Sequence, residues 1–105
     1  MEIERLQQAI RDLHGLESTH LRSEAVRETF RGKTVWEGMV DVFVVTGHPK
    51  ASVAYAWSHE TDEGGRRYVA VLGVDPIKSP LDAVRAHIVS EHEKAKQGAR
   101  GIDPF

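Results

Sequence analysis

Histidine and carboxylate side chains toward the end of the chain are the first residues that could do chemistry. His87, Glu91 and His92 fall in one predicted helix, in a stretch rich in acids. His87 and Glu91 are one helical turn apart, a spacing that lets two ligands converge on a metal ion. The side chains of His87 and His92, however, diverge by about 140° on a helix. We therefore expect a solvated helix flank here, and no metal site.

His48 is a second candidate, because it lies in Gly47-His48-Pro49, a predicted turn at the end of a strand. Loops held by a rigid scaffold often carry functional residues. An ordinary turn residue is the favoured interpretation, and a small metal or hydrolase site that uses His48 or His87 is kept as an alternative. The other histidines have no partner nearby in the sequence: His14, His20 and His59.

Two acids on one strand face do not make an acid–base pair. Glu37 and Asp41 lie roughly 13 Å apart on an extended chain that rises about 3.3 Å per residue, so we expect both to be solvated. The chain also lacks a Gly-x-Ser-x-Gly motif, a phosphate loop, a dinucleotide fingerprint and any cysteine. We therefore predict no catalytic residue, no metal ion and no cofactor.

Basic side chains could bind an anion at one predicted hairpin. Arg66 and Arg67 follow Gly64-Gly65, and they could gather with other cations to hold a phosphate: Arg31, Lys33 and Lys50. Asp62 and Glu63 precede them and dilute the positive charge, so a solvated charged loop is favoured. The formal net charge of -2 also argues against nucleic-acid binding.

The chain of 105 residues has the size of one domain. We predict a single domain over 1–97 and a flexible tail over 98–105, which contains Gly and Pro. The first residues include acids where a signal peptide needs a basic region, and the longest apolar stretch, 42–45, is far shorter than the roughly 20 residues that cross a bilayer. We therefore expect a cytoplasmic protein without membrane contact.

Two segments have the spacing of amphipathic helices. An apolar stripe in 3–13 should dock on the protein's own sheet, and this helix should stop near Gly15. A second helix should run from Pro80 to about Gln97, with Ser79 as its N-cap and Asp82 reaching back as in a capping box.

Other segments have the alternation of β-strands. In the first, 19–30, helical and strand patterns compete, and the strand is favoured; the clearer strands are 34–46, 51–58 and 66–74. Gly38 is a candidate for a β-bulge. The order predicts an α+β fold, in which an antiparallel meander of three or four strands is flanked by an N-terminal and a C-terminal helix.

The predicted sheet carries more apolar residues than one covered face needs. In 51–58 large residues alternate with alanine and serine, so we expect the helices on the small-residue face. The other face would expose aromatic residues, for which three explanations compete: helices on both faces, a groove for a small molecule or peptide, and a symmetric homodimer, which we favour. The expected contact residues are Phe43, Tyr55, Trp57 and Tyr68.

The element order resembles that of the double-stranded RNA-binding domain, which has a helix, three strands and a helix. Such domains carry a basic cluster at the start of the last helix, whereas here that helix opens with Ser79-Pro80-Leu81-Asp82 and has Arg85 as its only early cation. The resemblance implies, as an alternative, binding of duplex RNA through Arg66 and Arg67. We expect instead a small non-enzymatic domain that self-associates and binds an unknown small-molecule or protein partner through its aromatic sheet face.

Overall fold

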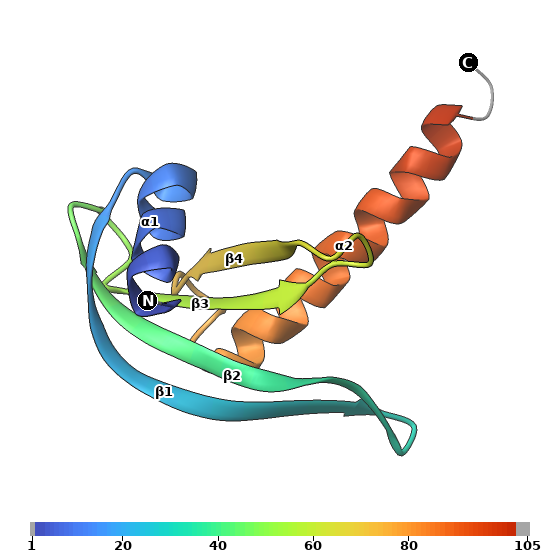
Figure 1. Ribbon diagram of the computed structural model, residues 1–105, viewed down its shortest axis with the longest axis horizontal. Coiled ribbons are helices and arrows are strands. Elements are labelled where there is room, and N and C mark those ends of the chain that lie inside the picture. Colours follow the sequence, from blue (N-terminus) through green and yellow to red (C-terminus); the bar gives the residue numbers. More distant parts are fainter. Residues whose placement is uncertain (1, 103–105) are drawn as a thin grey trace.

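The computed structural model describes the backbone of residues 2–102 and the side chains of residues 2–91. The four strands form one antiparallel sheet in the order β1-β2-β3-β4. In chain order, the elements are α1 (Glu2–His14), β1 (Glu17–Phe30), β2 (Lys33–Thr46), β3 (Val53–Glu60), β4 (Arg66–Leu72) and α2 (Pro80–Ile102) (Figure 1). The structure confirms the predicted α+β meander, including the strand over 19–30.

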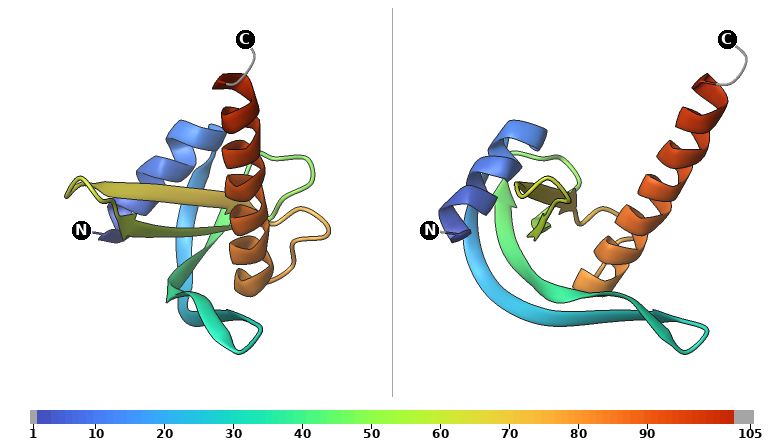
Figure 2. Two further views of the ribbon diagram at one scale, coloured as in Figure 1. Left: turned by 90° about the vertical axis from the view of Figure 1, so that its right-hand side faces the viewer. Right: turned by 45° about the vertical axis from the view of Figure 1, so that its right-hand side comes forward.

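The two helices pack on opposite faces of the sheet (Figure 2). On one face, Leu6 and Ile10 of α1 join a core cluster with the small residues of β3, such as Ala54. On the other face, Val84 of α2 joins the cluster that contains Trp57. The prediction that both helices share the small-residue face was therefore right for α1 and wrong for α2.

The connection from β4 to α2 explains this arrangement. Residues 73–79 carry the chain from the edge of the sheet onto the face with the large side chains. The N–H of Gly73 donates to the carbonyl of Val53 at 2.9 Å, and a Cβ at this position would lie only 2.6 Å from Val53 Cγ2. Because glycine has no Cβ, the chain can pass this close to β3 and reach the second face.

The start of α2 follows the predicted capping pattern. The hydroxyl of Ser79 accepts a hydrogen bond from the N–H of Asp82 at 3.1 Å, and the Asp82 carboxylate accepts one from the N–H of Lys78 at 3.1 Å. The helix ends at Ile102 instead of near Gln97, so it takes up part of the predicted tail 98–105, of which 103–105 lie outside the described residues. Within the described chain, no helix is both long and apolar enough to span a membrane.

The β1–β2 hairpin is long and curved, and its tip extends beyond the rest of the sheet (Figures 1 and 2). Its turn is formed by Arg31 and Gly32, which both have positive φ, 54° and 78°. The register of β1 against β2 shifts between His20 and Arg22 and again between Glu28 and Thr29. Gly38 pairs regularly with Val26, so the prediction of a bulge at Gly38 is wrong. A Cβ on Gly38 would instead stand 3.1 Å from the ring of Trp36, and the glycine leaves room for that ring.

Candidate functional site

The four residues predicted to contact a partner do not form an exposed surface. Phe43 is buried in the cluster under α1, whereas Tyr55 and Trp57 are buried in the cluster under α2. Tyr68 is half-buried beside the α1 cluster. The arrangement agrees with the first of the three explanations for the apolar sheet, helices on both faces. A contact role for these residues stays a prediction, and for the three buried ones it would require the helices to move.

Trp57 lies at the centre of the α2 side of the core. Its side chain is 1% exposed, and its ring meets the rings of Trp36 and His87 edge-to-face, at centroid distances of 5.7 and 5.6 Å. His87 also lies 3.8 Å from Glu91. His87 thus lies against an aromatic core residue and beside Glu91.

The structure gives the other candidate histidine a role in a turn. Nδ1 of His48 accepts hydrogen bonds from the backbone N–H groups of Lys50 and Ala51, at 3.0 and 2.8 Å. The side chain of His92 lies outside the described residues. Among the side chains that the structure describes, no group of three or more His, Asp or Glu residues is placed to hold a metal ion.

The two arginines predicted to bind an anion both face carboxylates of this chain. Arg67 Nη2 donates to Glu91 Oε1 at 2.5 Å. Arg66 donates to the hydroxyl of Ser58 at 3.0 Å, and its guanidinium lies 3.8 Å from Glu2 and 3.9 Å from Glu60. Lys50, in the loop before β3, is at the opposite end of that strand from the loop before Arg66. Lys50 therefore does not join Arg66 and Arg67 at one end of the sheet, as the sequence predicted.

A histidine that has no partner nearby in the sequence acquires one across the sheet. His20 Nε2 lies 2.9 Å from Asp41 Oδ1, and the hydroxyl of Ser23 donates to the same oxygen. Asp41 is buried, contrary to its expected solvation. The residue types are those of a catalytic triad, but the geometry differs. Here the same ring nitrogen of His20, Nε2, lies near Asp41 Oδ1 and 3.4 Å from the Ser23 hydroxyl. In a triad the histidine binds the serine and the acid through different ring nitrogens. The cluster instead gives a buried carboxylate its hydrogen-bond partners. The only sign of it in the sequence is an acid within an apolar strand.

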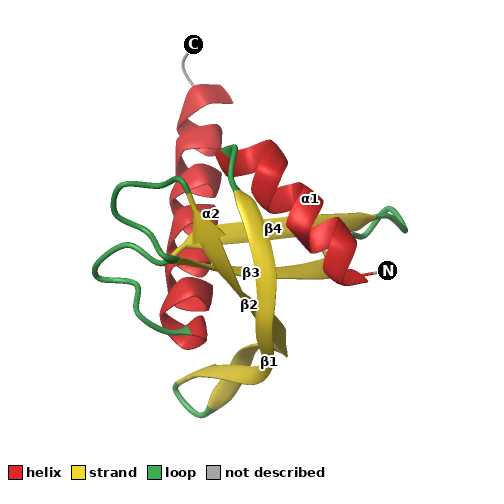
Figure 3. Ribbon diagram, turned by 90° about the vertical axis from the view of Figure 1, so that its left-hand side faces the viewer, coloured by secondary structure: helices red, strands yellow, loops and turns green. Residues whose placement is uncertain are grey.

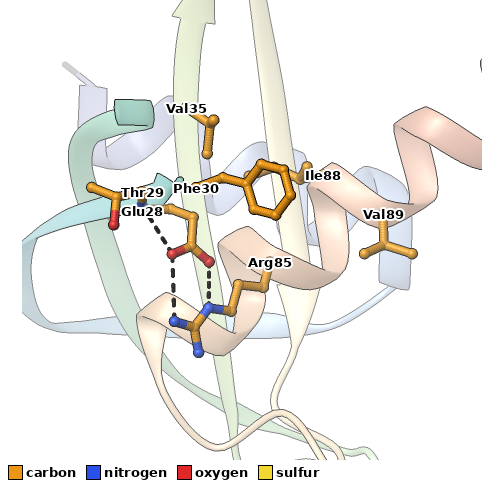
Figure 4. A pocket seen from close by; sticks show the side chains of 7 residues that line it. All are labelled: Glu28, Thr29, Phe30, Val35, Arg85, Ile88 and Val89. Carbon is orange, nitrogen blue, oxygen red and sulfur yellow. Dashed lines mark hydrogen bonds and ion pairs between the residues drawn. The ribbon is translucent and has the colours of Figure 1, made fainter. Parts of the chain in front are cut away.

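An apolar groove lies between the tip of the β1–β2 hairpin and α2 (Figure 4). Its volume is about 550 Å³. Three large apolar side chains in it are unusually exposed: Phe30 by 63%, Val35 by 49% and Val89 by 60%. Figure 4 shows Phe30 and Val35 on the hairpin side and Ile88 and Val89 on the helix side. The groove therefore gathers exposed apolar surface that neither element buries alone.

An ion pair closes one end of this groove. The guanidinium of Arg85 donates to both oxygens of Glu28, and Glu28 Oε1 also accepts the N–H of Thr29 at 3.0 Å. The hydrogen bond from Arg85 holds the pKa of the Glu28 carboxyl below its ordinary value. The two charges offset each other, so the groove presents an apolar surface with a neutralised polar end.

The sequence alone does not predict this groove. Phe30 and Val35 flank a hairpin turn, and Val89 lies in the predicted second helix. Each is a single exposed apolar residue, and such residues are common on protein surfaces. Only their convergence in space distinguishes them.

Comparison of this chain with known protein families, with curated proteins and with solved structures finds no match. The fold defines the protein as an α+β domain with an open antiparallel sheet.

Proposed function

We propose that this chain is a non-catalytic protein-interaction domain whose groove binds an apolar segment of a partner protein. The observation that carries the proposal is the convergence of Phe30, Val35 and Val89 on one concave surface. Contiguous exposed apolar surface on a folded domain marks an interaction site more often than scattered apolar residues do. Aromatic side chains such as Phe30 are enriched among the residues that dominate binding.

The chemistry of the groove favours a protein segment over other ligands. A site for a small molecule combines an apolar pocket with a few polar groups that converge on the ligand. Here the two charged side chains in the groove, Glu28 and Arg85, are hydrogen-bonded to each other. A nucleic acid needs cations that are free to meet phosphates. Arg85 is engaged by Glu28, and the guanidinium of Arg31 lies over the ring of Phe30, 5.2 Å from its centroid. An apolar segment needs neither feature, because its affinity comes from burial of side chains between the hairpin and α2.

A peptide library displayed on phage tests the proposal with the unmodified chain as bait. We expect the enriched peptides to share two or three apolar residues, at the spacing of one helix face or one strand face. Binding of these peptides should fall at least tenfold for Phe30→Asp and for Val89→Asp. Each variant buries a charge in the groove if the peptide stays bound.

Leu13→Asp is the matched control, because Leu13 is a similarly exposed apolar residue, at 58%, on α1. This variant should bind the selected peptides as the unmodified chain does. Equal binding by all three variants would place the site elsewhere. Enrichment of charged peptides that lack apolar residues would also contradict the proposal. Circular dichroism of each variant checks that the fold is kept.

A further inference from the structure

The two outer strands of the sheet, β1 and β4, differ in how far side chains hydrogen-bond to their backbone edges. At the β4 edge, Nε2 of His14 hydrogen-bonds to the carbonyl of Ala70 at 2.8 Å. At the start of β1, Gln7 Nε2 donates to the carbonyl of Ser18 at 2.9 Å. Both His14 and Gln7 belong to α1. One helix thus supplies side-chain partners to the backbone of β4 and to the first part of β1.

The run from Arg22 to Glu28 in β1 carries charged side chains, but within the described residues it has no such hydrogen bonds from side chains to its backbone. From Arg22 to Glu28, the pairing with β2 is regular and lies between the two register shifts. In the described part of the chain, no side chain hydrogen-bonds to the backbone along this run. An outer strand presents a row of unpaired N–H and C=O groups on the side away from its neighbour, which is a template for another strand. Figure 3 shows the sheet from the side of β1.

We infer that the run Arg22–Glu28 pairs with the same run of a second copy of this chain, antiparallel and about a two-fold axis at Ala25. The two four-stranded sheets would then continue into one another. In this register Ala25 faces itself, and Arg22 faces Glu28 of the second copy, once on each side of the axis. The regular run is centred on Ala25, so the pairing stays clear of both register shifts.

The charges of the strand disfavour the two neighbouring positions of the axis. Arg22, Glu24 and Glu28 project from the same face, because alternate residues of a strand share a face. If the axis moved by one residue to Glu24, the Glu24 carboxylates of the two copies would face each other. If it moved by one residue to Val26, Glu24 would face Glu28. Like charges directly opposite each other destabilise a strand pair, and opposite charges stabilise it. The axis at Ala25 avoids both clashes.

This interface is separate from the proposed groove. Ala25 is exposed on the sheet face opposite α2, where it pairs with exposed Met39. Phe30 and Val89, which carry the groove, lie outside the paired run. Glu28 is the only residue that the two surfaces share. Within one chain its carboxylate binds Arg85, and Arg22 binds Glu24, so the facing charges of the second copy would extend these ion pairs. A substitution at Ala25 therefore tests self-association without altering the groove.

A single cysteine gives the sharpest test, because the chain has no cysteine of its own. In Ala25→Cys, the two thiols of a pair would face each other across the axis. Opposite residues of antiparallel strands have Cα atoms about 4.5–5.5 Å apart, within the range that a disulfide spans. We expect mild oxidation of Ala25→Cys to give a covalent dimer on a non-reducing gel. The matched control is Thr19→Cys, also exposed on β1, whose two thiols would be roughly 40 Å apart at about 3.3 Å per residue.

Light scattering after size exclusion supplies the second measurement. The unmodified chain should have the mass of two chains, and both Ala25→Lys and Ala25→Glu should have the mass of one. Mixing the two variants should restore the mass of two, because a lysine then faces a glutamate. An unmodified chain that is monomeric at every concentration would overturn the inference. A dimer that persists in both variants, or equal cross-linking of the two cysteine variants, would overturn it as well.

Discussion

The guanidinium of Arg85 on α2 is hydrogen-bonded to the carboxylate of Glu28 on β1, although the two residues are 57 positions apart. The Glu28 side chain is 15% exposed and the Arg85 side chain 54%. The pair joins the helix to the hairpin at the end of the apolar groove. It therefore links the two walls of the groove in which we propose that a partner segment binds.

The pKa of Glu28 should depend on Arg85. The hydrogen bond from Arg85 lowers this pKa in the folded protein. In Arg85→Met, the apolar part of the side chain is kept and the charge is lost, so the pKa of Glu28 should rise. The measurement is an NMR titration of the Glu28 side-chain carboxyl carbon in both proteins. An unchanged titration curve would show that Arg85 does not hold the carboxylate in solution.

The same ion pair should make a pH-dependent contribution to stability. Because the folded-state pKa of Glu28 is lowered, the contribution is present above the pKa of the unfolded state and is lost as the pH falls through the folded-state pKa. The difference in free energy of unfolding between the unmodified chain and Arg85→Met should therefore be largest near neutral pH. Urea denaturation at a series of pH values checks this. A difference that grows toward acidic pH would have the wrong sign.

Trp57→Ala should destabilise the fold strongly. The Trp57 ring is almost fully buried between Trp36 and His87, and removing such a side chain costs about 3–5 kcal/mol. A domain has only about 5–15 kcal/mol of stability in total. The measurement is the free energy of unfolding in urea, with Leu13→Ala as the control at an exposed site. A stable Trp57→Ala protein that has lost self-association would instead support the original expectation of a contact residue.

Asp41→Ala should destabilise the sheet at the first register shift of β1. The substitution leaves His20 and Ser23 without the carboxylate that they share. Because Ser23 is exposed and His20 is partly exposed, water can replace the carboxylate, and each lost hydrogen bond should cost about 0.5–1.5 kcal/mol. Asp41→Asn keeps an acceptor oxygen at the same place and should be less destabilising. Urea denaturation of the two variants makes the comparison, and equal stability of Asp41→Ala and the unmodified chain would rule out a structural role for the cluster.

The sequence by itself determined the elements of this protein. The strand over 19–30, the stripe that docks α1 and the N-cap at Ser79 were all predicted from spacing and residue type. These features depend on contacts within a few residues, or on the alternation of a single strand. Local patterns of this kind set which face of an element is apolar.

The tertiary structure decided what those apolar faces meet. The alternation in β3 marked two apolar faces, but only the path of residues 73–79 past Val53 decided that α2 covers Tyr55 and Trp57. The pairing of His20 with Asp41 depends on the register of β1 against β2. The groove depends on the angle between the hairpin and α2. Each arises from contacts between distant parts of the chain, whose relative positions the local pattern of residues does not specify.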